Sequence, residues 1–102
     1  MIQWQDVIQA KERISSHIVR TPLLRIPALD EAVGCQVYLK HEGFQPMGAF
    51  KLRGAMNKAL SLTPEERERG LVCASSGNHA QGVAYAAHKL GCRGVIVMPT
   101  NV

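Results

Sequence analysis

The sequence predicts an α/β protein with an open parallel sheet and helices on both faces. Two short apolar runs, at 71–74 (LVCA) and 94–98 (GVIVM), flank a run rich in small residues at 79–90. Strand, helix and strand in this order pair in parallel through a right-handed crossover. Gly91 after the helical run and Pro99 after the second apolar run are typical ends of a helix and of a strand.

The first forty residues predict two helices and a strand. Apolar residues recur at helical spacing from Asp6, taken as the N-cap, to His17. Pro22 then favours an extended segment. A short helix is expected at 27–32, with Gly34 ending it, and 37–41 (VYLKH) is expected to be a strand.

The middle of the chain predicts a loop followed by two helices. The loop covers 42–48 and the first helix 50–62. Its candidate apolar face comprises Phe50, Leu52, Ala55, Met56, Ala59, Leu60 and Leu62. The run TPEE at 63–66 predicts the start of a further helical turn, which Gly70 closes.

Composition places the chain among cytoplasmic globular proteins. It has 102 residues, 46% of them hydrophobic and 20% charged, without an apolar run of membrane-spanning length or a signal-peptide pattern. The net charge of +4 comes from basic residues interleaved with acids, as in PEERERG, so neither nucleic acid nor a membrane is an expected partner. Cys35, Cys73 and Cys92 lack CxxC spacing, and we expect buried, reduced thiols.

Lys51 is the leading candidate for a chemical role. It lies between a predicted strand and a predicted helix, in a loop region that carries Gly43 and Gly48. A lysine amine becomes nucleophilic when desolvation or a nearby positive field favours its neutral form. A helix N-terminus supplies such a field, and Arg53 is close in sequence. The alternative is a surface lysine in the first turn of a helix.

A second loop, SSGN at 75–78, follows the strand at 71–74. It places two hydroxyls and a carboxamide at the carboxyl end of a strand, where open parallel sheets bind ligands. The alternative is an N-cap for the next helix. His79 could act as a base or a metal ligand, but with His41 and His88 it shows no metal-type spacing, so no metal is expected.

Three segments resemble one enzyme family in order and spacing. KHEGFQPMGAFKLRGA, SSGNHAQGVAYAA and LGCRGVIVMP, preceded by RTPLL, resemble the serine/threonine dehydratase and serine racemase family. These are fold-type II, tryptophan synthase beta-like enzymes that depend on pyridoxal 5'-phosphate. The resemblance implies an N-terminal segment of about 1–45 and part of the small domain at about 46–102, together a single incomplete unit.

The resemblance also implies roles for individual residues. Lys51 would form the internal aldimine and act as the base at the substrate α-carbon, beside the ring of Phe50. Asn78 would hydrogen-bond the phenolic oxygen of the cofactor, and Ser76 would act on the opposite face of the α-carbon. The substrate-binding residues implied are Ser75, Ser76, Gly77, Asn78 and His79.

The activity implied is elimination of water from a hydroxy amino acid, which gives a 2-oxo acid and ammonia. A serine racemase activity and a truncated, non-catalytic fragment are the alternatives, and threonine, serine and hydroxyaspartate stay open as substrates. Met47 and Ala49 depart from the family pattern, which commonly has hydroxyl residues there. The glycine-rich phosphate loop of the family lies outside these residues, and a homo-oligomer is possible for a full-length form.

Overall fold

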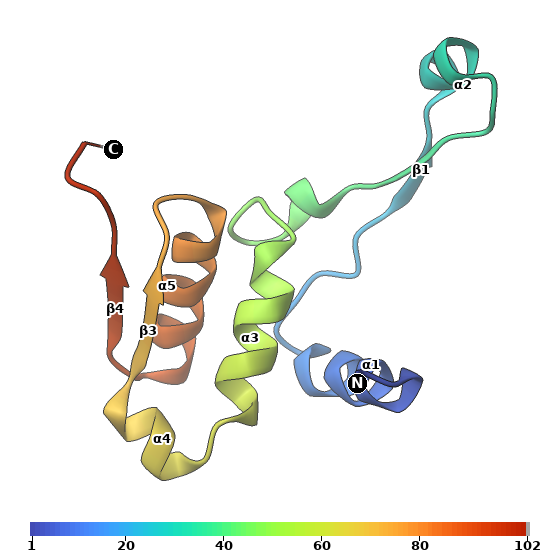
Figure 1. Ribbon diagram of the computed structural model, residues 1–102. Helices are drawn as coiled ribbons and strands as arrows, with labels where there is room; N and C mark the ends of the chain where they lie inside the picture. Colours follow the sequence, from blue (N-terminus) through green and yellow to red (C-terminus); the bar gives the residue numbers. More distant parts are fainter. Residues whose placement is uncertain (102) are drawn as a thin grey trace.

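Ten short elements follow one another along residues 1–101, the part of the chain that the computed structural model describes. In order they are α1 (Trp4–Ile14), β1 (Leu23–Arg25), α2 (Pro27–Val33), β2 (Tyr38–Lys40), the 3-10 helix η1 (Glu42–Phe44), α3 (Lys51–Ser61), α4 (Pro64–Arg69), β3 (Leu71–Ala74), α5 (Asn78–Leu90) and β4 (Gly94–Val97). Figure 1 shows a body built from α3, α5, β3 and β4, and an arm of β1, α2 and β2 that extends away from it.

The first helix begins earlier than predicted. Asp6 lies in the first turn of α1, and its carboxylate accepts a hydrogen bond from the backbone N–H of Gln3 at 2.8 Å. Gln3 is the N-cap, so the prediction that Asp6 caps the helix is wrong: the carboxylate reaches back from the third helical position instead. The helix ends at Ile14, and the predicted continuation to His17 is a turn closed by a 2.9 Å bond from the His17 N–H to the Ile14 carbonyl.

The arm is an antiparallel pair of strands with a helix at its tip. Leu23 lies opposite Lys40 and Arg25 opposite Tyr38. The extended chain after Pro22 and the second strand were predicted, but their pairing was not. The helix α2 ends as expected at Gly34, which has a φ of 71°. The exposed large apolar side chains of the arm are Leu23, Leu24, Leu29, Val33, Tyr38 and Leu39.

The parallel pair predicted from the strand, helix and strand order is present. Register runs from Leu71 opposite Gly94 to Ala74 opposite Val97, and α5 packs against both strands. In residues 1–101, α5 covers one face of this pair, as Figure 1 shows, while Val72 on the other face is 73% exposed. The α/β class is confirmed.

The hydrophobic core lies where α3 crosses α5. The buried members of this cluster are Ile14, Leu52, Ala55, Met56, Ala59, Val83 and Ala86. Small side chains on both helices allow their backbones to approach closely. Phe50 is 59% exposed and therefore lies outside the apolar face to which the sequence pattern assigned it.

The three cysteines are free thiols. Cys73 and Cys92 are half-buried, whereas Cys35 is exposed just beyond α2. The expectation of burial is therefore wrong for Cys35, because the arm that carries it does not pack against the body of the chain.

Candidate functional site

Lys51 is the first residue of α3, and its side chain is exposed. Its Nζ lies 5.2 Å from the centre of the Phe50 ring. Phe50 is the N-cap residue of α3 and makes no capping bond through its side chain. The N–H groups of Leu52 and Arg53 donate instead to the backbone carbonyls of Ala49 and Phe50, at 3.4 and 3.0 Å. The position at a helix start was predicted, but the surrounding residues leave the amine accessible to solvent.

A cavity of about 360 Å³ opens at this end of α3. It is lined by Phe50, Lys51, Arg53, Gly54, Ala55 and His79. The first five residues come from the start of α3, and His79 comes from the first turn of α5. The fold therefore brings three sequence-predicted residues, Phe50, Lys51 and His79, to one cavity from segments almost thirty residues apart in the chain.

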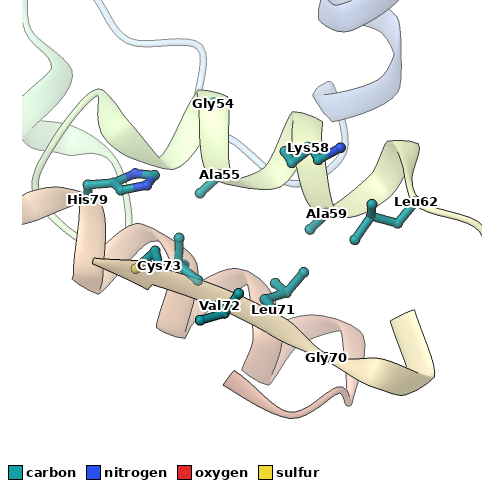
Figure 2. A pocket seen from close by; sticks show the side chains of 11 residues that line it. Gly54, Ala55, Lys58, Ala59, Leu62, Gly70, Leu71, Val72, Cys73 and His79 are labelled. Carbon is teal, nitrogen blue, oxygen red and sulfur yellow. The ribbon is translucent and has the colours of Figure 1, made fainter. Parts of the chain in front are cut away.

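A second cavity, of about 290 Å³, runs between α3 and β3 and shares His79 with the first. Figure 2 shows the His79 ring at one end of this cavity, with Leu62 toward the other end and Val72, Cys73 and Leu71 along the strand. Its lining is mostly aliphatic. The second cavity also has a lysine, Lys58, but we place the candidate site in the first cavity, because that cavity is lined by both Lys51 and the neighbouring Phe50 ring.

The loop 75–77 lies at the carboxyl end of β3, beside the candidate site. The Ser75 N–H donates to the Val97 carbonyl at 3.0 Å, and the Gly77 N–H donates to Ser75 Oγ at 3.3 Å. Gly77 is the N-cap of α5 and Asn78 its first residue, without a capping bond from a side chain. The alternative role of this loop as a side-chain N-cap is therefore wrong, and the N–H groups at the start of α5 are available for an anion.

Neither cavity includes Ser75, Ser76, Gly77 or Asn78 in its lining. Their place in the site stays a prediction, and Figure 1 shows the loop after β3 and the start of α3 at the same end of the body. Ser76, Gly77 and Asn78 are exposed, and Ser75 is half-buried. The structure thus groups the two predicted loops at one end of the body, and Gly54, Ala55 and His79 line both cavities.

A polar cluster beside the site was missed by sequence reasoning. The Glu42 carboxylate accepts hydrogen bonds from Arg53 Nε and Arg53 Nη2, both at 2.7 Å, and from Thr21 Oγ1 at 2.6 Å. Gln45 Nε2 donates to it at 3.2 Å. The Arg53 guanidinium is the main cause, with smaller contributions from Thr21 and Gln45, of a Glu42 pKa lowered to about 2. The Arg53 guanidinium, which the sequence placed near Lys51, therefore points toward Glu42.

No group of three or more histidine, cysteine, aspartate or glutamate side chains is placed to hold a metal ion in residues 1–101. The His41 ring instead packs against the ring of Phe44 at a centroid distance of 4.6 Å.

Comparison with known proteins gives consistent matches. A family model described as "pyridoxal-phosphate dependent enzyme" matches residues 14–102. The biosynthetic L-threonine dehydratase of Corynebacterium glutamicum is 48% identical over 99% of this chain, which corresponds to 23% of that protein. The chain thus spans about a quarter of the length of this curated relative.

Solved structures agree with the sequence matches. The T.th. threonine deaminase has a TM-score of 0.88 and 46% identity, over 99% of this chain and 32% of that one. The serine racemase of Dictyostelium discoideum has a TM-score of 0.93 and 37% identity, over 99% of this chain and 33% of that one.

Proposed function

Because the chain belongs to the family of pyridoxal-phosphate-dependent enzymes, we propose that it is a segment of a serine/threonine dehydratase, an ammonia-lyase. Family membership confirms the resemblance and the partial fold-type II architecture predicted from the sequence. The reaction removes water from a hydroxy amino acid, and hydrolysis then gives a 2-oxo acid and ammonia. The observation that carries the proposal is the convergence of Lys51, Phe50 and His79 on one cavity.

The residues of this cavity fit pyridoxal phosphate. The cofactor carries an aldehyde, for which a primary amine is the matching nucleophile, and a flat aromatic ring, for which an exposed phenyl ring is a stacking partner. Lys51 supplies the amine, and Phe50, 59% exposed, supplies the ring. When bound, the cofactor supplies an electron sink for the pair of electrons left at the substrate α-carbon.

Lys51 would hold the cofactor and then act as the base at the α-carbon. Its Nζ is accessible at the first position of α3. It could therefore release the cofactor when the substrate binds and then accept the proton from the substrate α-carbon.

The loop at the start of α5 would hold the substrate. Ser75, Ser76 and Gly77 present hydroxyl and N–H groups at the N-terminus of a 13-residue helix, where a carboxylate is stabilised by the helix dipole. Asn78 carries a carboxamide that can donate to an oxygen of the cofactor ring, and His79 borders the cavity that contains Lys51. Water exclusion on this side would come from Phe50.

Racemisation is the second candidate activity. It is favoured by the TM-score of 0.93 to a serine racemase and by Ser76, an exposed hydroxyl on the loop before α5. A racemase must exchange the α-proton from both faces of the substrate, whereas a lyase needs one face. Incorporation of solvent deuterium at the α-carbon of recovered D-serine, starting from L-serine, separates the two activities.

The setting of the enzyme is part of the same proposal. We expect a cytoplasmic protein that acts on threonine, serine or hydroxyaspartate and forms homo-oligomers when full length, with residues 1–45 preceding part of a small domain at 46–102. The names of the relatives and the three free thiols support this setting. Over residues 1–101, none of the helices has the length and apolar content needed to cross a membrane.

The test of the site uses the chain as it is. The purified chain is mixed with pyridoxal phosphate, reduced with borohydride and digested, and the modified lysines are identified by mass spectrometry. We expect the adduct mainly on Lys51, its loss in Lys51→Ala, and its retention in the matched variant Lys58→Ala, which removes a lysine from the same helix. Equal modification of all the lysines in the unaltered chain would contradict the proposed role of Lys51.

A further inference from the structure

The cluster around Glu42 joins three segments at the point where α3 begins. Thr21, which is 5% exposed, lies before β1, Gln45, which is 3% exposed, lies in the loop after η1, and Arg53 lies in the first turn of α3. All three donate hydrogen bonds to the Glu42 carboxylate. A single carboxylate thus connects the chain before the arm, the loop after the arm and the helix that carries Lys51.

The loop itself is held in place by Gln45. Its side-chain amide donates from Nε2 to the Val19 carbonyl at 2.9 Å and accepts at Oε1 from the Val19 N–H at 3.0 Å. This reciprocal pair fixes the loop to the segment that follows α1. The loop that carries Glu42 is therefore held in place against this segment. The two hydrogen bonds from Arg53 to Glu42 connect the loop in turn to α3.

The first turn of α3, whose Leu52 is packed in the core, has few other polar restraints. Its N-cap makes no side-chain bond, and the turn contains no acidic residue that would interact with the helix dipole. Its backbone is closed by bonds from Leu52 to the Ala49 carbonyl at 3.4 Å and from Arg53 to the Phe50 carbonyl at 3.0 Å. The fork formed by the guanidinium and the carboxylate is the strongest polar contact of this turn, because it is both bidentate and charge-assisted.

From this geometry we propose that Glu42 is the positioning residue for Lys51, acting through Arg53. Arg53 lies two residues after Lys51, and both line the cavity of the candidate site. Holding the guanidinium against Glu42 fixes the rotation of the first turn about the helix axis and hence the direction of the Lys51 side chain. The inference rests on the proposed function for the role of Lys51, and the contact itself does not depend on it.

A positioning role and a purely stabilising role predict different results. The variant Glu42→Gln keeps the size of the side chain and removes its charge. Asp30→Asn is a matched control: Asp30 also pairs with an arginine, Arg25, and its side chain is 20% exposed against 16% for Glu42, but it lies in the arm. The quantity measured is the rate of modification of Lys51 by pyridoxal phosphate, relative to Lys58 and Lys89 in the same molecules.

We expect the relative rate at Lys51 to fall by about fivefold or more in Glu42→Gln. The fall should be smaller in Arg53→Lys, which keeps the charge but loses the two parallel hydrogen bonds. Asp30→Asn should leave the relative rate unchanged. All variants are compared at a temperature where their near-ultraviolet circular dichroism is that of the folded chain. A Glu42→Gln protein that is less stable yet keeps the Lys51 to Lys58 ratio unchanged would overturn the proposal and leave Glu42 with a stabilising role alone.

Hydrogen exchange separates this proposal from the proposed function. If Lys51 shows no preference in the unaltered chain, its proposed cofactor role is contradicted, and the exchange rates of amides 51–55 then decide the positioning role. Faster exchange there in Glu42→Gln, with amides 83–87 of α5 unchanged, supports positioning. Unchanged exchange at 51–55 contradicts it.

Discussion

Gly82 of α5 lies against the backbone of Lys51. A Cβ atom at position 82 would be 3.2 Å from the Lys51 carbonyl oxygen and 3.3 Å from the Ala55 Cβ. The absence of a side chain at Gly82 therefore sets how closely the two helices approach, and it does so at the residue that carries the amine. The candidate site is connected to the packing of the core through this contact.

We expect Gly82→Ala to destabilise the chain by about 1 kcal/mol, because the overpacking it causes exceeds the gain in helix propensity. The displacement of the α3 backbone should also slow modification of Lys51. Unfolding in urea measures the first effect, and borohydride trapping measures the second.

Gly54→Ala is the matched control for this prediction. Gly54 is also a helical glycine, and a Cβ there would meet nothing within 4 Å. This substitution should stabilise the chain by about 0.5–1 kcal/mol through helix propensity alone. Equal stabilisation by Gly54→Ala and Gly82→Ala would show that the two helices have room to separate.

The Glu42 cluster predicts how stability changes with pH. The Glu42 pKa of about 2 in the folded chain lies below the ordinary value of 4.5, so the unfolded chain binds more protons between these pH values. The charged groups facing the carboxylate are Arg53 at 2.7 Å and Lys40 at 3.7 Å. The stabilisation is complete above pH 4.5 and is lost as the pH falls toward 2.

The expected loss is on the order of 2 kcal/mol, since solvent near the carboxylate screens part of the interaction. Urea midpoints measured from pH 6 down to pH 2.5 should fall less steeply in Glu42→Gln than in the unaltered chain. The exposed Glu31→Gln serves as the control and should keep the original slope. A Glu42→Gln chain with the same acid dependence as the unaltered chain would contradict the ionic cluster.

The body of the fold follows from local sequence signals. The capping pair Thr63 and Glu66, with hydrogen bonds of 2.9 and 3.2 Å, and the glycines that end α2 and α5, could be recognised because each acts within a few residues. The strand, helix and strand unit was predictable because the lengths of its apolar runs and the order of its elements determine parallel pairing. These are short-range rules.

The long-range contacts could not be predicted in this way. Thr21 and Glu42 are 21 residues apart, and nothing in their spacing indicates that a hydroxyl and a carboxylate will meet at 2.6 Å. The pairing of β1 with β2 is likewise a contact between segments that α2 separates in the sequence. Lys51 was identifiable from its motif, whereas the residues that hold its helix were visible only in three dimensions.

Substitution of Phe50 tests the site with little effect on the stability of the folded chain. Its ring is 59% exposed and lies 5.2 Å from Lys51 Nζ, so its truncation removes little buried surface. If the ring stacks beside the cofactor, Phe50→Ala should weaken binding of pyridoxal phosphate by about two- to tenfold, the range expected for one aromatic contact. Phe44→Ala is the matched control, since Phe44 is 57% exposed and lies in η1, outside the lining of the cavity. Absorbance titration of both variants measures the affinity, and an equal loss in the two would show that general aromatic exposure, and not the position of Phe50, governs binding.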